Sequence, residues 1–178
     1  MPETLPRFPR ALSLAATPLP LAPLSLGLGA LTRRLSQAHP DMLRRMGDHA
    51  NRRFLIDPVD FPVVLLLHPA SLKMTAHRRR NPPAHDARIA GTLSAFLAMM
   101  HGVQDGDALF FSRDLTVEGD TAAVLALRNA IDDAELDLTE ELAGLAGPLS
   151  NPLRRALGRA EKISGVSLHR TDPWEDYT

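Results

Sequence analysis

Strand-like runs crowd into residues 52–91, and helical spacing of the apolar residues follows them. The runs at 52–57, 62–68, 71–77 and 87–91 are short and are separated by turn residues. A fifth run, at 115–119, lies between two stretches with helical spacing. Strands grouped ahead of helices are typical of an α+β domain. We therefore predict a five-stranded, mostly antiparallel sheet covered by helices.

Two helices, 92–101 and 121–131, are predicted to cover this sheet, with Thr92 and Asp120 as their N-caps. Residues 122–127 of the second helix are apolar without a break. The helical repeat of the first is carried by Leu93, Phe96, Leu97 and Met100. The two helices have more apolar surface than one narrow stripe needs. Either a larger core or a bound ligand could take up that surface.

Residues 11–32 carry no charge and resemble a membrane segment at first sight. Pro18, Pro20 and Pro23 fall within six positions and would break a spanning helix, which needs about 20 apolar residues. The prolines also break the apolar part of a signal peptide, and no clear small-residue cleavage site follows. We predict an extended apolar arm on the protein's own surface, then short helices at 28–37 and 40–51.

Composition narrows the function classes. The chain has 178 residues, with 20 basic and 21 acidic side chains, so nucleic acid is not expected as the main partner. It has no Cys, which excludes disulfides and thiolate chemistry. The seven His lack metal-binding spacing, and the serines examined lie outside any nucleophile elbow. We predict a protein that is not an enzyme and holds no metal or cofactor.

Two basic patches each admit two interpretations. Arg78, Arg79 and Arg80 form either a solvated hairpin tip or a contact with anionic lipid headgroups. The basic helix predicted at 152–163, with Arg154, Arg155 and Arg159, either contacts the same headgroups or packs on the core through its apolar side. Between these patches, the acidic block at 132–141 is predicted to be a solvated helix face.

The passage DALFFSRDLTVEGDTAAVLALRNAI, residues 107–131, resembles the closing half of the sterol carrier protein type 2 domain. The preceding ARIAGTLSAFLAMMHG, residues 87–102, resembles the strand and helix before it. PLPLAPL at 18–24 and RRFLIDPVDFPVVLLLHP at 52–69 are similar to the UbiT branch, bacterial accessory factors for ubiquinone biosynthesis. The resemblance covers about residues 18–136.

The resemblance implies an apolar lipid tunnel between the sheet and the helices. Phe110 and Phe111 would wall it, and Leu115 and Val117 would close its sheet side. The full set of expected lipid-binding residues is Phe96, Leu97, Met100, Phe110, Phe111, Leu115, Val117, Val124 and Leu127. The expected division is a proline-rich arm with short helices at 1–50, the lipid-binding domain at 51–136, and a helical extension with a polar tail at 137–178.

The same resemblance implies a cytoplasmic accessory factor, peripherally associated with anionic membranes. It would hold a prenylated quinone precursor or membrane lipid and work beside UbiU- and UbiV-type hydroxylase components of the oxygen-independent route. Two alternatives stay open from the residues. One is a general carrier of sterols, fatty acids or phospholipids, and the other is a structural interaction protein with a filled core.

Overall fold

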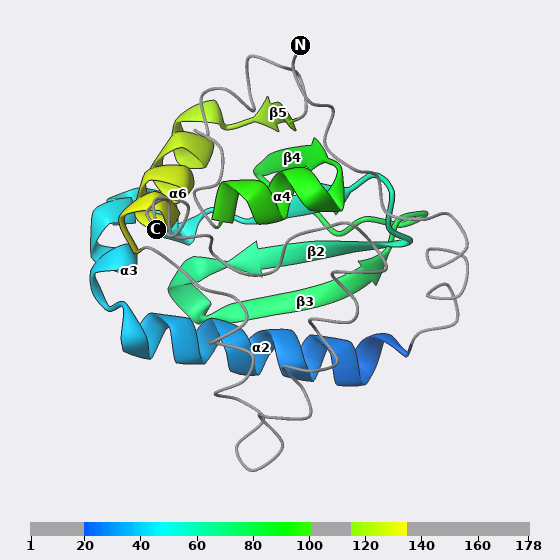
Figure 1. Ribbon diagram of the computed structural model, residues 1–178, viewed down its shortest axis with the longest axis horizontal. Helices are drawn as coiled ribbons and strands as arrows, with labels where there is room; N and C mark the ends of the chain where they lie inside the picture. Colours follow the sequence, from blue (N-terminus) through cyan, green and yellow to red (C-terminus); the bar gives the residue numbers. More distant parts are fainter. Residues whose placement is uncertain (1–19, 101–114, 135–178) are drawn as a thin grey trace, which may run out of the picture.

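The computed structural model describes residues 20–100 and 115–134. Figure 1 shows a twisted sheet with helices α4 and α6 over one face and α2 along one edge. In chain order the elements are α2 (Leu21–Ala38), α3 (Asp41–Met46), the 3-10 turn η1 (Gly47–Asn51), β1 (Phe54–Pro58), β2 (Val63–His68), η2 (Pro69–Ser71), β3 (Lys73–Arg78), β4 (Ala87–Gly91), α4 (Leu93–Met100), β5 (Leu115–Gly119) and α6 (Thr121–Ala134).

The five strands form one sheet in the order β3-β2-β1-β4-β5. Three neighbouring pairs are antiparallel, and the central pair, β1 with β4, is parallel. The predicted five-stranded, mostly antiparallel α+β fold is confirmed. The parallel pair arises because the chain crosses from β3 at one edge, past β2 and β1, to begin β4.

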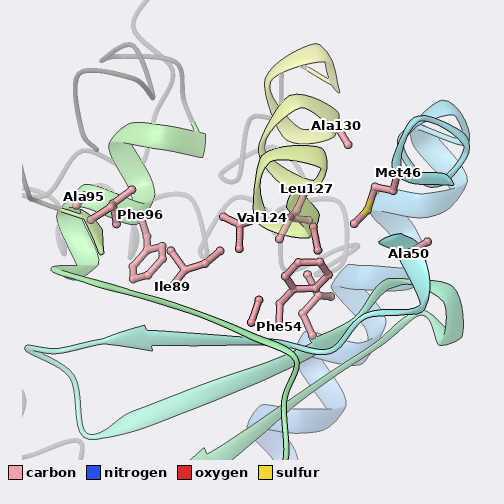
Figure 2. Close-up of a cluster of buried hydrophobic side chains, with 13 residues drawn as sticks. Met46, Ala50, Phe54, Ile89, Ala95, Phe96, Val124, Leu127 and Ala130 are labelled. Carbon is pink, nitrogen blue, oxygen red and sulfur yellow. The ribbon is translucent and has the colours of Figure 1, made fainter. Parts of the chain in front are cut away.

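The core lies between the sheet and α4, α6 and α3. Alternate strand residues point into it, as the pleat requires. Phe54, Ile89 and Leu115 come from β1, β4 and β5, while Val124 and Leu127 come from α6. Figure 2 shows these α6 side chains pointing toward Phe54, and Phe96 of α4 beside Ile89. One continuous apolar cluster therefore joins the helical layer to the sheet.

Helix α2 begins earlier than the sequence pattern indicates. The predicted arm is wrong for residues 21–32, because an 18-residue helix runs from Leu21 to Ala38. Pro20 occupies the N-cap and Pro23 lies in the first turn, where a backbone N–H has no partner within the helix. The prolines therefore help to start the helix, and they do not exclude it.

Helix α2 lies along β3, the strand at one edge of the sheet. The Ala76 backbone N–H donates to Ser25 Oγ at 2.9 Å, so a helix side chain satisfies an edge donor that no strand can reach. The predicted helix at 40–51 is also adjusted. It is an α-helix only to Met46, and Gly47, with φ of +52°, starts the 3-10 turn.

The join between β5 and α6 depends on two consecutive residues. Gly119 has φ of +84°, and a Cβ there would lie 2.4 Å from the Asp86 carbonyl oxygen. Asp120 then accepts the Ala123 backbone N–H at 3.0 Å, which confirms the predicted N-cap of α6. The positive φ and the close approach of backbone together require glycine at 119.

Candidate functional site

The apolar cluster gathers five of the expected lipid-binding residues. Phe96, Leu115, Val124 and Leu127 are buried members, and Val117 packs against them partly buried. They come from α4, β5 and α6, which lie apart in the sequence. Their convergence was expected from the spacing of apolar residues, and it provides an apolar surface suited to alkyl chains.

Helix α4 is fixed at its N-terminus by two side chains. Thr92 Oγ1 accepts the Ala95 backbone N–H at 3.2 Å, which confirms it as a cap. Asp60, in the β1–β2 turn, accepts the Leu93 backbone N–H at 2.8 Å. The carboxylate at the positive end of the helix is also electrostatically favourable. These contacts hold Phe96 over the sheet.

The remaining members of the expected set lie elsewhere. Leu97 and Met100 belong to α4, but their side chains fall outside the described residues. Phe110 and Phe111 also fall outside them, as do Arg154, Arg155 and Arg159. Their roles stay predictions.

An open pocket of about 230 Å³ lies at the junction of α2, α3 and the end of α6. Its lining includes His39, Asp41, Arg45 and Asp133, and an ion pair joins Arg45 to Asp133. None of the expected lipid-binding residues lines it. Its charged lining is unlike an alkyl-chain site, which is mostly apolar.

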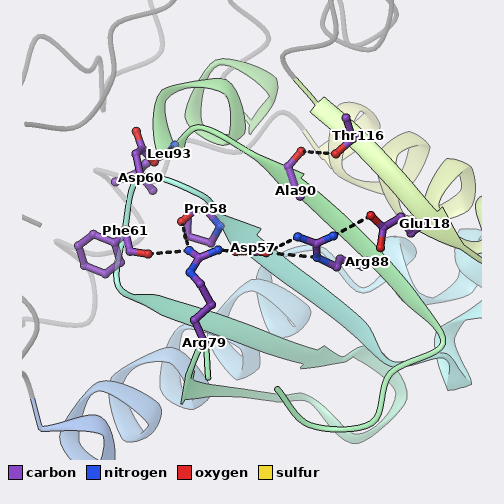
Figure 3. Close-up of polar contacts among 10 residues, drawn as sticks. All are labelled: Asp57, Pro58, Asp60, Phe61, Arg79, Arg88, Ala90, Leu93, Thr116 and Glu118. Atoms are coloured by element: carbon purple, nitrogen blue, oxygen red, sulfur yellow. Dashed lines mark hydrogen bonds and ion pairs between the residues drawn. The ribbon is translucent and has the colours of Figure 1, made fainter. Parts of the chain in front are cut away.

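On the opposite face of the sheet, a line of charges crosses the central strands (Figure 3). Asp57 of β1 has a side chain only 5% exposed, and it lies between Arg79 and Arg88. Arg88 donates to Asp57 through Nη2 at 2.6 Å and to Glu118 of β5 at 2.7 Å. The hydrogen bond with Asp57 is the main reason that the pKa of Arg88 is raised.

Arg79 is the third partner in this network. Its guanidinium forms an ion pair with Asp57 and donates to the carbonyl oxygens of Pro58 at 2.6 Å and Phe61 at 2.7 Å. It therefore closes the β1–β2 turn. The expectation that Arg79 contacts lipid headgroups is corrected here, because its donors are aimed at the protein.

The neighbours of Arg79 differ from it. Arg78 ends β3 and is half-buried, whereas Arg80 is exposed at the start of the following loop. Reasoning from the sequence treated the three arginines alike and missed Asp57. One signal was available: Asp57 interrupts the alternation of an otherwise apolar strand, on the same face as buried Leu55.

Other classes of site were searched for in the described residues. Within residues 20–100 and 115–134, no group of three or more His, Asp or Glu side chains is placed to hold a metal ion. No helix in this part of the chain combines the length and the apolar character needed to cross a bilayer.

Comparison with solved structures supports the fold. The structure of "UbiJ-SCP2 Ubiquinone synthesis protein" matches with a TM-score of 0.51 and 20% identity, over 66% of this chain and 96% of that one. Apo sterol carrier protein 2 of Yarrowia lipolytica matches with a TM-score of 0.40 and 14% identity, over 58% and 88%. Sterol carrier protein-2 like-3 of Aedes aegypti gives 0.44 and 13%, over 57% and 95%.

Comparison at the level of sequence gives the family. No curated protein matches the sequence. A family model does: that of the SCP-2 sterol transfer family matches residues 30–132, more than half of the chain. The matched range runs from α2 to α6 and contains the whole sheet and the apolar cluster. This chain therefore belongs to the SCP-2 sterol transfer family.

Proposed function

We propose that this protein is a non-catalytic lipid-binding accessory factor for ubiquinone biosynthesis. The observation that carries the proposal is the convergence of Phe96, Val117 and Leu127, with their neighbours, on one apolar cluster within the family's matched range. An elongated apolar ligand would lie along this surface, between α4, α6 and the sheet. Phe110 and Phe111 are proposed to complete its wall.

The proposed ligand is a prenylated quinone precursor. A prenyl tail presents only hydrocarbon, and each buried methylene contributes about 0.8 kcal/mol, so an apolar tunnel can bind it without a polar anchor. The likeness in fold to a protein described as a ubiquinone synthesis protein supports this choice of ligand. The protein would present the precursor to hydroxylases of the UbiU and UbiV type and perform no chemistry itself.

A second candidate is a general carrier of sterols, fatty acids or phospholipids. The family's description as a sterol transfer family favours it. Both candidates require loading from a bilayer. Arg80 and the predicted basic helix with Arg154, Arg155 and Arg159 are proposed to contribute to contact with anionic headgroups.

Lipid extracted from the purified protein tests the proposal by mass spectrometry. Prenylated phenols or quinones in stoichiometric amount are the expected result. Sterols or acyl chains would support the general carrier, and a protein free of lipid would support a filled, structural core. Phe111→Asp should abolish lipid retention, because an unpaired charge in a dry apolar site is costly. Leu125→Asp is the control, because Leu125 is 54% exposed on α6.

A further inference from the structure

The outer face of α2 lacks the polar residues that a surface helix normally presents to water. In its first two turns the exposed residues are Ala22, Pro23, Leu26 and Gly27, and Leu26 is 73% exposed. The first charged residue of the helix is Arg33. A helix packed on a globular domain usually places charged and polar residues on this face. Its apolar start is thus left without a partner among the described residues.

The apolar start of α2 lies at the same end of the sheet as the β1–β2 turn. Ser25 contacts Ala76, and Gly29 lies over Met74, so α2 runs antiparallel to β3. Its first residues therefore lie near the end of β3, where Arg78 pairs with Val63 at the start of β2. Figure 1 shows the N-terminus of α2 and the β1–β2 turn at this one end.

The turn at this end also exposes an apolar side chain. Val59 is 54% exposed, and its turn is held firmly in place. The Val59 backbone N–H donates to the Gly91 carbonyl oxygen at 2.7 Å, and Arg79 binds the carbonyl oxygens of Pro58 and Phe61. A single exposed valine is ordinary, but this one is fixed beside a second exposed apolar surface.

The charge of this end has one sign in two of its three segments. Residues 21–38 and 68–85 contain Arg33, Arg34, Lys73, Arg78, Arg79 and Arg80, with no Asp or Glu. The third segment, the turn, has two acids, and both are engaged within the protein. Asp57 binds Arg79 and Arg88, and Asp60 accepts the N–H of Leu93. Apolar side chains among basic ones suit the surface of an anionic bilayer.

We propose that the end of the sheet formed by the start of α2, the β1–β2 turn and Arg80 docks on an anionic phospholipid bilayer. Leu26 and Val59 would enter the headgroup region, and Arg80 would meet lipid phosphates. The purpose of this docking rests on the proposed function, because a lipid carrier must load from a membrane. The contact itself is a separate property of the surface.

Vesicle flotation of the full-length protein tests the docking. Vesicles of phosphatidylcholine alone are compared with vesicles containing phosphatidylglycerol, at low and high salt. We expect binding to the anionic vesicles that weakens with salt. Leu26→Asp and Val59→Asp should each weaken it roughly tenfold or more, because each removes apolar burial and adds repulsion. Arg80→Gln should weaken it about fivefold.

Leu125→Asp is the matched control, because Leu125 and Val59 are both 54% exposed and lie on different elements. It should float like the wild type. Flotation unchanged in both Leu26→Asp and Val59→Asp, an equal loss in Leu125→Asp, or no binding of the wild type to anionic vesicles would overturn the proposal. The last result would leave a protein as the occupant. Lipid extracted from the same variants separates this outcome from failure of the proposed function, since a protein free of lipid can still float.

Discussion

Replacing Arg79 by Met should destabilise the protein far more than replacing Arg80 by Met. Arg79 donates to buried Asp57 and to two backbone carbonyl oxygens, whereas Arg80 is exposed. A hydrogen bond to a charged group contributes about 1.5–3 kcal/mol and a neutral one about 1 kcal/mol. Arg88 keeps its own two hydrogen bonds to Asp57, so the lower values apply.

The expected loss for Arg79→Met is about 2–3 kcal/mol in the free energy of unfolding, against at most about 0.5 kcal/mol for Arg80→Met. For a chain of this size that is a fall in Tm of about 5–10 °C. Thermal and urea unfolding followed by circular dichroism measure both variants. Arg79→Lys should fall between them, because one ammonium cannot span three acceptors. Equal losses in Arg79→Met and Arg80→Met would refute the assignment of Arg79 to the turn.

Three further predictions concern the loops that join the strands to the helices. Gly119→Ala should cost about 2 kcal/mol or more, because φ is +84° and the new Cβ meets the Asp86 carbonyl; a Tm within 2 °C of the wild type, about what 1 kcal/mol gives, would contradict this. Asp120→Ala should cost about 1 kcal/mol and Asp120→Asn much less, since Asn caps as well; equal losses in urea unfolding would show that the charge itself matters. Hydrogen bonds from Arg53 lower the pKa of Asp86 below its ordinary value of 3.8, so the unfolded chain binds that proton more tightly. The contribution of Asp86 is therefore present above a pH of about 4 and is lost as the pH falls through the folded pKa. The difference in unfolding free energy between the wild type and Asp86→Asn should shrink in acid, and a constant difference would contradict the linkage.

Periodicity predicted the elements whose apolar pattern is local. The strand at 87–91 and the strand at 115–119 have the bounds expected, and the cap at Asp120 follows from its place before an apolar helix. These features depend on neighbours within a few residues. The gathering of Phe96 and Leu127 in one cluster also follows, because each apolar face must be buried against the other.

Other features depend on contacts between distant residues and leave little trace in the pattern. Three consecutive arginines look alike until the fold places Asp57 beside one of them. The helix at the start of α2 was missed because proline was treated as a breaker, although it is tolerated in a first turn. The parallel pairing of β1 with β4 follows from the path of the chain across the sheet, which no single stretch records.

The position of α2 along β3 has a consequence for making shorter versions of this protein. An uncovered edge strand offers its unpaired backbone groups to strands of other molecules and so promotes aggregation. Here Ser25 occupies one such group, at Ala76, and the body of the helix covers its surroundings. Because α2 precedes the sheet in the chain, it leaves the ribosome before the edge that it covers. A fragment beginning after Ala38 would keep every strand of the described sheet, yet it should self-associate edge to edge and fail to stay monomeric.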